Sequence, residues 1–157
     1  VYAVGNQVTV QRLNWIPPTR WGGTCDPPLT LYCDETAHGT TAGGTNRITS
    51  YSGGTCVGTY SELGKEAYYR FDSPIMGWAT ARLTPTQNNL DLVVIGGVED
   101  NGACDPASCV AGSNMTGLSP DEVTFPVKVG QTFYLVVDSP TDVPSGFSIE
   151  ISCDKNP

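Results

Sequence analysis

The feature that most constrains the fold is a series of short β-prone segments that fills most of the chain after residue 60, with Gly, Pro and Asp between them. Short segments with this punctuation are typical of an all-β sandwich. No long stretch carries its apolar residues at helical spacing. We therefore predict strands at residues 66–71, 77–84, 90–95, 109–111, 122–127, 132–137 and 147–152.

Two of these segments indicate how their side chains are oriented. Segment 77–84 alternates, which places Ala79, Ala81 and Leu83 on one face and a second set, Trp78, Thr80 and Arg82, on the other. Segment 90–95 is apolar on both faces apart from Asp91, which is typical of a central strand.

The first part of the chain is less regular. We expect short strands at 29–33 and 47–51, the latter at an edge, with a Thr/Gly loop at 39–46. Residues 2–13 form a further strand candidate, and the prolines and tryptophans that follow it interrupt both ladder pairing and helix. At 157 residues the chain fits one core-forming domain of about nine strands, residues 25–157, preceded by an extension, residues 1–24.

Six cysteines without a CxxC pair, alongside the single histidine His38, favour three disulfides over a zinc site. Disulfides place the protein in an oxidising compartment, and we predict that it is secreted. Six cysteines allow 15 connectivities. Proximity along the chain favours three pairs: Cys104–Cys109, Cys25–Cys33 and Cys56–Cys153.

The formal net charge of −8 argues against nucleic acid and against electrostatic docking on an anionic membrane. No apolar stretch approaches the ~20 residues of a membrane helix, so we expect no membrane insertion. The β-like start at Val1 is typical of a mature product after signal-peptide cleavage. An acidic chain is suited to a hard cation such as Ca²⁺, although the charge alone also serves solubility.

The acidic stretch around residue 100 is the best candidate for such a cation. Carboxylate and amide oxygens are the ligands that Ca²⁺ prefers, and it takes six to eight of them. The alternative is a solvated turn whose Asp and Asn side chains bond their own backbone. The predicted ligands are Glu99, Asp100, Asn101 and Asp105, joined from another loop by Asp138 and Asp142.

Catalytic motifs are missing from the sequence: it has no HExxH, GxSxG, phosphate loop or GxGxxG. His38 lies among small residues, where we expect it to be solvent-exposed rather than catalytic. We therefore predict a non-enzymatic protein, with a hydrolase built on an unrecognised carboxylate pair as the open alternative. Asn114 begins a glycosylation sequon.

Aromatic side chains leave two interpretations open. Stacking on a sugar is one, and filling the core or covering the sandwich edge is the other. The residues concerned are Trp15, Trp21, Tyr32, Tyr51, Tyr60 and Trp78.

The order of these motifs resembles the bacterial pre-peptidase C-terminal (PPC-like) domains, which are secreted modules. The matching pieces lie between about residues 25 and 153: GGTN at 43–46, GKEAYYRF at 64–71, LDLVV at 90–94, CDPASC at 104–109, GQTFYLVVD at 130–138 and GFSIEISC at 146–153. The resemblance implies a jelly-roll-like, non-enzymatic antiparallel β-sandwich used for adhesion, targeting or stabilisation. It also implies calcium binding in some members. The pattern does not cover residues 1–24.

The main functional hypothesis is a structural or adhesive subunit of a bacterial cell surface or extracellular filament, with other copies of the chain as partners. In this hypothesis Tyr2, Val4, Val8 and Val10 belong to a strand that pairs with a neighbouring copy. The same strand could instead complete its own sandwich. A module that binds carbohydrates or surfaces beside a secreted hydrolase is the alternative function.

Overall fold

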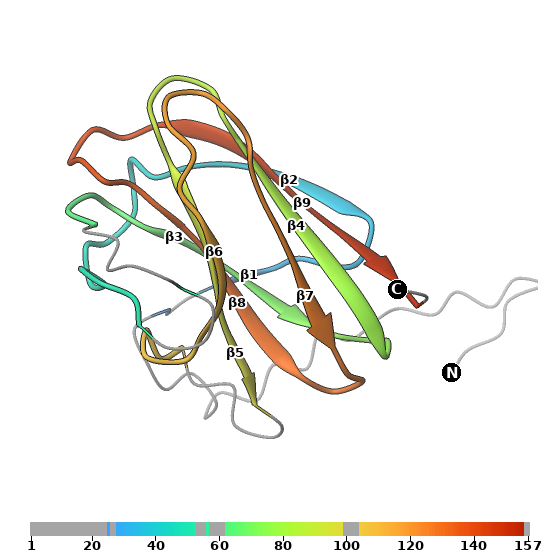
Figure 1. Ribbon diagram of the computed structural model, residues 1–157. Coiled ribbons are helices and arrows are strands. Elements are labelled where there is room, and N and C mark those ends of the chain that lie inside the picture. The colour runs from blue at the N-terminus through green and yellow to red at the C-terminus, as the bar shows by residue number, and fades with distance from the viewer. Residues whose placement is uncertain (1–24, 26–27, 53–55, 57–61, 99–103, 156–157) are drawn as a thin grey trace, which may run out of the picture.

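The computed structural model describes residue 25, residues 28–52, residue 56 and residues 62–98 and 104–155, which form two β-sheets packed face to face (Figure 1). The five-stranded sheet has the order β1-β3-β8-β5-β6, and the four-stranded sheet β2-β9-β4-β7. The bounds are β1 Leu29–Thr30, β2 Glu35–Thr40, β3 Ala67–Asp72, β4 Gly77–Pro85, β5 Asp91–Val98, β6 Cys109–Ser113, β7 Asp121–Val127, β8 Thr132–Asp138 and β9 Gly146–Asp154. The predicted jelly-roll-like, disulfide-bonded antiparallel sandwich is confirmed.

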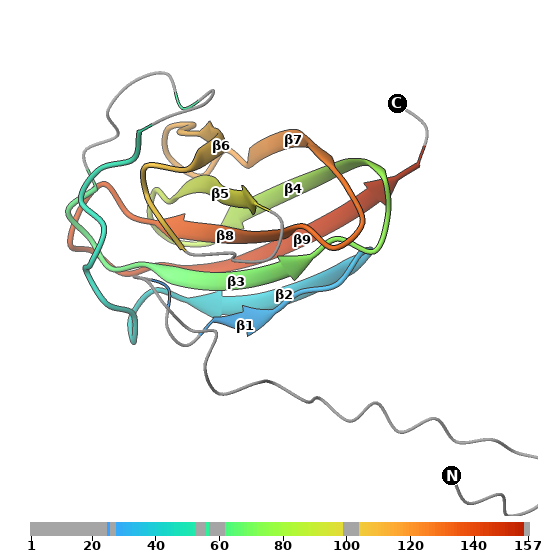
Figure 2. The ribbon, with the colours of Figure 1, turned by 90° about the horizontal axis from the view of Figure 1, so that it is seen from below.

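Pairing is antiparallel throughout these sheets except between β1 and β3, which run parallel. β5 lies between β8 and β6, which confirms its prediction as a central strand. Seen from below, β6 and β7 lie at one side of the sandwich and β1 and β2 at the other (Figure 2). Across the described residues, no helix has the length and apolarity needed to cross a bilayer.

The main core fills the space between the two sheets. The predicted alternation along β4 is confirmed, and the structure shows that the face with Ala79, Ala81 and Leu83 is buried while the Trp78 face turns outward. Phe133 of β8 lies at the centre of this core, with ring centroids 5.0 Å from Phe125 and 6.2 Å from Phe71.

A second core lies on the outer face of the five-stranded sheet. Residues 41–64, of which 41–52, 56 and 62–64 are described, form a covering segment over this face and bury Ile48 and Tyr51 against it. The sheet contributes a set of apolar and aromatic residues to this core: Tyr68, Val93, Ile95, Tyr134 and Val136. The five-stranded sheet is therefore buried on both faces, which explains the continuous apolar runs of β5 and β8.

The six cysteines form three disulfides, but the predicted pairing is wrong at every bond. The observed bonds are Cys25–Cys104, Cys33–Cys153 and Cys56–Cys109. Proximity along the chain failed because the covering segment carries Cys56 onto β6, while Cys33 lies beside the end of β9. The shortest of these bonds spans 53 residues, so none is a local loop clip.

Three local predictions also differ from the structure. Residues 47–51 are not a strand, because the covering segment crosses the sheet instead of extending it. Within 29–33 only Leu29–Thr30 pairs. Part of the predicted Thr/Gly loop belongs to β2, a polar strand held by its pairing with β9. The predicted strand 2–13 lies outside the described residues.

Candidate functional site

One side of the sandwich is open. β6 and β7 contact one another, whereas β2 and β3 are separated by a groove of about 270 Å³. Its walls come from three places: β1 and β3 of one sheet, β2 of the other, and the start of the covering segment at Gly43–Thr45. Leu29, at the rim, is 65% exposed.

Two tyrosines of β3, Tyr68 and Tyr69, line this groove. Tyr69 of β3 and Phe147 of β9 are buried in an edge-to-face pair, with centroids 6.2 Å apart. Gly39 of β2 leaves room for both rings, because a Cβ there would lie 2.6 Å from the Tyr69 hydroxyl oxygen and 2.7 Å from the Phe147 ring. Tyr69 therefore presents its hydroxyl to the groove while its ring remains in the core.

β2 presents a free edge to this side. Thr41 donates its N–H to the Ser145 carbonyl at the end of the β2–β9 ladder. In an antiparallel ladder, successive residues turn their backbone groups to opposite sides. Thr36, His38 and Thr40 therefore turn their N–H and C=O away from β9, and no strand among the described residues lies on that side of β2.

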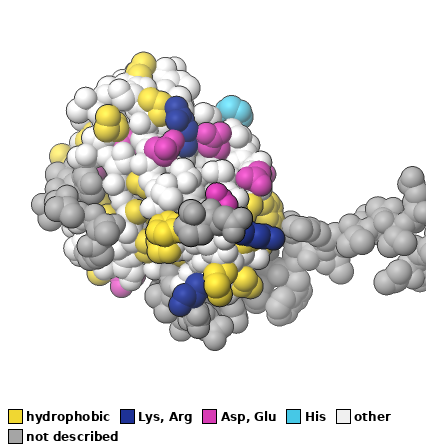
Figure 3. Space-filling model, turned by 45° about the vertical axis from the view of Figure 1, so that its right-hand side comes forward, with side chains coloured by type: hydrophobic (Ala, Val, Ile, Leu, Met, Phe, Trp, Pro, Cys, Tyr) yellow, Lys and Arg dark blue, Asp and Glu magenta, His cyan; other side chains and the backbone are white. Residues whose placement is uncertain are grey.

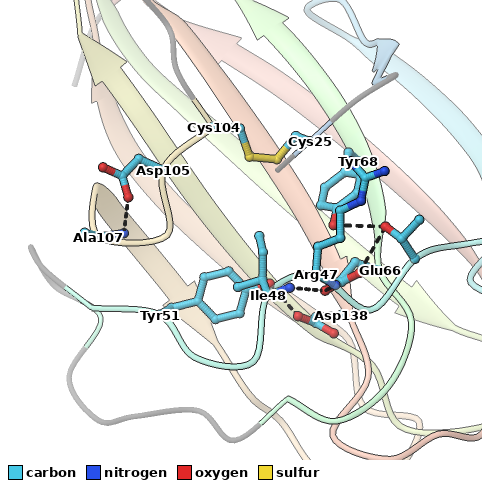
Figure 4. Close-up of a disulfide and its surroundings, with 11 residues drawn as sticks. Cys25, Arg47, Ile48, Tyr51, Glu66, Tyr68, Cys104, Asp105, Ala107 and Asp138 are labelled. Carbon is cyan, nitrogen blue, oxygen red and sulfur yellow. Dashed lines mark hydrogen bonds between the residues drawn. A yellow bond between two sulfur atoms is a disulfide. The ribbon is translucent and has the colours of Figure 1, made fainter. Parts of the chain in front are cut away.

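A second site lies where the covering segment meets the five-stranded sheet. Glu62, Glu66, Asp91 and Asp138, here called the carboxyl cluster, are all buried. Glu66 anchors the segment, because its Oε1 accepts hydrogen bonds from the backbone N–H of Arg47 at 2.8 Å and of Ile48 at 2.6 Å (Figure 4). Its Oε2 accepts a longer bond, 3.5 Å, from the Thr45 hydroxyl.

Asp138 is the second anchor. Its carboxylate accepts hydrogen bonds from the hydroxyl of Tyr51 and from the backbone N–H of Ser139. Burial raises the pKa of Asp138 to about 7, although both hydrogen bonds favour its charged form. Burial, followed by the negative charge of Asp138, also raises the pKa of Tyr51, so this phenol remains a donor.

Glu62 and Asp91 form a carboxyl pair with fewer partners. Burial, followed by the charge of Asp138 and contact with Asp91, raises the pKa of Glu62 to about 9. Burial likewise raises the pKa of Asp91, partly offset by the neighbouring Glu62 and by the hydrogen bond from the Asn89 side-chain amide. Because Glu62 is 1% and Asp91 4% exposed, the pair is closed to a substrate and does not form a hydrolase site.

The calcium site predicted around residue 100 is not assembled from the residues that the structure describes. Asp105 accepts a hydrogen bond from the Ala107 N–H, which is the turn-capping role weighed as its alternative. Asp138 donates no ligand toward Asp105, because it faces Tyr51 instead. Asp105 and Asp138 lie apart in Figure 4. Among the described residues, no three Asp, Glu, His or Cys side chains are arranged to hold a metal ion. Glu99, Asp100 and Asn101 lie outside the described residues.

The remaining predicted residues are dispersed. His38 is exposed, as expected. Asn114 is exposed in the turn after β6, and Asp142 is exposed in the turn before β9. Of the aromatic residues, Tyr51 fills the second core, while Tyr32 is 45% and Trp78 36% exposed. Trp15, Trp21, Tyr60 and the four proposed assembly residues, Tyr2, Val4, Val8 and Val10, lie outside the described residues.

Trp78 borders a polar face on the outside of the four-stranded sheet. There Arg82 lies between Glu122, at 3.1 Å, and Glu150, at 3.9 Å. Figure 3, which brings this side of the molecule forward, shows acidic side chains on either side of a basic one. A hollow of about 270 Å³ lies here between β2, β9, β4 and β7.

The carboxyl cluster was missed from the sequence. The available signal was Asp91, the one polar residue in an otherwise apolar central strand, and the pair Glu62 and Glu66 just before an aromatic strand. A buried strand carries an acid at such a position only where the fold supplies it with partners.

Comparisons with known proteins place the fold. The pre-peptidase C-terminal domain of collagenase from Bacillus anthracis is 13% identical to this chain, with a TM-score of 0.53, and the match covers 80% of this chain and 94% of that one. The periplasmic inhibitor of g-type lysozyme from Aeromonas hydrophila is 10% identical over 79% of this chain and 95% of that one, with a TM-score of 0.46. No family model and no curated protein sequence matches. The chain thus has a PPC-like fold, as the sequence motifs predicted.

Proposed function

We propose that this protein is a non-enzymatic, secreted β-sandwich module that serves as a structural subunit of a bacterial cell surface or extracellular filament. Copies are joined by strand addition at the β2 edge. The observation that carries this proposal is the free edge of β2 beside the open groove. The three disulfides support export and mechanical stability.

The backbone supplies the first part of the recognition. An incoming strand would satisfy the outward N–H and C=O groups of Thr36, His38 and Thr40, and main-chain bonds of this kind provide affinity without requiring a particular sequence. β2 has few of the devices that protect an edge, since its ETAHGT sequence contains no proline and only one charged residue, Glu35.

The groove supplies the second part. Alternate side chains of an added strand point to the same face, so every second residue would enter the groove above Tyr69. The groove is lined by the exposed Leu29 and by Gly43 and Gly44, which have no side chains to fill it, so its lining is partly apolar. An apolar, β-branched strand is the occupant that such a wall favours.

The occupant we assign is residues 1–13 of a second copy. This segment places Tyr2, Val4, Val8 and Val10 at even positions, and its one charged side chain is Arg12. Arg12 is opposite in charge to Glu35, the one charged residue of β2. Donation from each copy to the next does not close on itself and therefore produces a fibre.

The test compares the full chain with a variant lacking residues 1–13 by light scattering, sedimentation and negative-stain microscopy. Assembly of the full chain that the deletion abolishes, while circular dichroism shows a folded monomer, supports the proposal. A full chain that stays monomeric at high concentration contradicts it. If the full chain stays monomeric and the variant lacking residues 1–13 does not fold, residues 1–13 belong to the sandwich of their own copy.

A substitution on β2 tests the edge itself. His38→Pro removes one outward N–H and leaves the bonds to β9 in place, a position where an edge strand tolerates proline. His38→Ala is the matched control, because it retains that N–H. We expect His38→Pro to reduce assembly at least tenfold and His38→Ala to preserve it. Equal assembly by both variants would contradict docking on this edge.

Sugar binding is the second candidate function, favoured by the Trp78 face. An exposed indole beside a row of polar groups, including the hydrogen-bonded hydroxyls of Thr80 and Thr124 (2.8 Å), provides stacking and orienting contacts. A glycan array with the full chain, repeated with Trp78→Ala, tests it. Binding that this substitution abolishes supports the role, and the lack of any bound glycan contradicts it.

A further inference from the structure

The outer face of the four-stranded sheet presents two different rows of exposed side chains. Strand register places Trp78 of β4 opposite Pro126 of β7 in one row. The other row has Arg82 of β4 between Glu122 of β7 and Glu150 of β9. The two rows lie four residues apart along β4, which corresponds to about 13 Å. One row is apolar and the other is charged, so this face can recognise a partner at two points.

The apolar row continues onto the adjacent end of the sandwich. Met76, in the loop before β4, is 70% exposed, and Val129, in the turn after β7, is 65% exposed. Backbone hydrogen bonds between Ser73 and residues 130 and 131 hold this loop and this turn together. Figure 3 shows hydrophobic side chains beside the acidic ones on this side of the molecule. A group of large exposed apolar side chains is typical of an interaction surface.

The charged row borders the hollow of about 270 Å³ described above, which has an excess of negative charge. Four carboxylates and one guanidinium line this hollow: Asp34, Glu35, Glu122, Glu150 and Arg82. An occupant that brings a positive charge would therefore complement it.

The segment that follows the proposed donor strand has the matching composition. Residues 14–21 read NWIPPTRW, with apolar and aromatic residues and one charge, Arg20. Residues 1–24 contain no acidic side chain, although the whole chain has 16. A Pro-Pro pair favours an extended polyproline II conformation, which docks on aromatic surfaces and rises about 3.1 Å per residue. Trp15 and Arg20 are then about 16 Å apart, which is close to the spacing of the two rows.

We propose that residues 14–21 of the donating copy lie across this outer face, with Trp15 on the Trp78 patch and Arg20 in the acidic hollow. This inference rests on the proposed function and adds a direction to it, namely that residues 1–13 run antiparallel to β2. The hollow reaches β2 only at its start, at Glu35 and Thr36. An antiparallel donor ends beside that start, whereas a parallel donor ends near Thr40, about 17 Å away.

The experiment measures the critical concentration for assembly of the full chain by sedimentation. Arg20→Ala and Glu150→Gln should each raise it about threefold, the effect of one exposed ion pair. The double variant should also show about threefold, because both changes remove the same contact. Trp78→Ala should raise it at least tenfold, since a tryptophan in an interface often dominates binding. Arg20→Lys and Asp142→Asn are the controls, and both should assemble like the full chain.

Other outcomes overturn this inference and separate it from the proposed function. A full chain that never assembles contradicts both. Assembly that requires residues 1–13 but is unchanged by Arg20→Ala and Trp78→Ala leaves strand addition in place and removes this docking. An additive double variant, about ninefold, shows that Arg20 and Glu150 do not meet.

Two further results would assign the outer face to another occupant and so contradict the inference. Below the critical concentration, urea unfolding tests whether Arg20→Ala and Glu150→Gln destabilise the monomer in a coupled way, which would place residues 14–21 on their own copy. If Trp78→Ala abolishes glycan binding and leaves assembly unchanged, the face binds sugar. Circular dichroism of each variant shows that it is folded.

Discussion

Replacing Glu66 with alanine should detach the first half of the covering segment from the five-stranded sheet. The side chain is 1% exposed and receives the backbone N–H groups of Arg47 and Ile48 at 2.8 and 2.6 Å. These bonds occur where the segment turns onto the second core. Their loss leaves the Ile48 N–H buried without an acceptor.

The expected cost follows from the two donors. A hydrogen bond to a charged group contributes about 1.5–3 kcal/mol, and a buried donor left without a partner costs a similar amount. The Ile48 N–H loses its full bond, while water can replace the acceptor of the Arg47 N–H, since Arg47 is exposed. We therefore expect a loss of about 3 kcal/mol, or roughly a 150-fold larger unfolding constant.

Urea unfolding measures this loss. With a slope of about 2 kcal/mol per molar urea, the midpoint should fall by about 1.5 M. Glu66→Gln retains one acceptor oxygen and should lose about half as much. Glu122→Ala, which removes an exposed ion-pair partner, should lose no more than about 0.5 kcal/mol. If Glu66→Ala loses under 1 kcal/mol, or if the Ile48 amide exchanges no faster, the anchoring role of Glu66 is refuted.

Three further predictions concern stability. Phe125→Ala, at a 1% exposed site against Phe133, should cost about 3–5 kcal/mol in urea unfolding, and a cost below 1 kcal/mol would place the core elsewhere. Opening the Cys33–Cys153 bond, whose cysteines lie 120 residues apart, with paired serines should cost about 4–5 kcal/mol in the chain-entropy model. Unreduced peptide mapping that finds any other cysteine pairing would contradict the fold. The free energy of unfolding should fall as pH rises from about 5 to 9. Folded Glu62 and Asp138, with pKa values raised to about 9 and 7, retain protons that the unfolded chain has lost, and Glu62→Gln should flatten this slope.

The central strands could be predicted from the sequence because a buried strand needs apolar residues at the positions that face a core. β5 and β8 are apolar on both faces, and β4 alternates between small residues and the polar Trp78 face. β2 could not be predicted, since an exposed edge strand needs no apolar pattern. Its conformation comes from pairing with β9, whose strand lies more than a hundred residues away along the chain.

The disulfides and the carboxyl cluster depend on the path of the covering segment. Residues 47–51 resemble a strand locally, yet they cross the sheet, bring Tyr51 to Asp138 and direct the chain toward the Cys56–Cys109 bond. A contact between residues 87 positions apart leaves no local signal. Asp91 was visible as an exception within its strand, but the identity of its neighbour Glu62 came only from the tertiary structure.

The central claim is that β2 receives a strand from another copy, and amide hydrogen exchange of the full chain at increasing protein concentration tests it most directly. Thr36, His38 and Thr40 have outward N–H groups without a strand neighbour among the described residues. Their exchange should slow as concentration rises, whereas the amides of Ala37 and Gly39, which face β9, should stay protected throughout. Exchange at Thr36, His38 and Thr40 that is independent of concentration would contradict assembly through this edge.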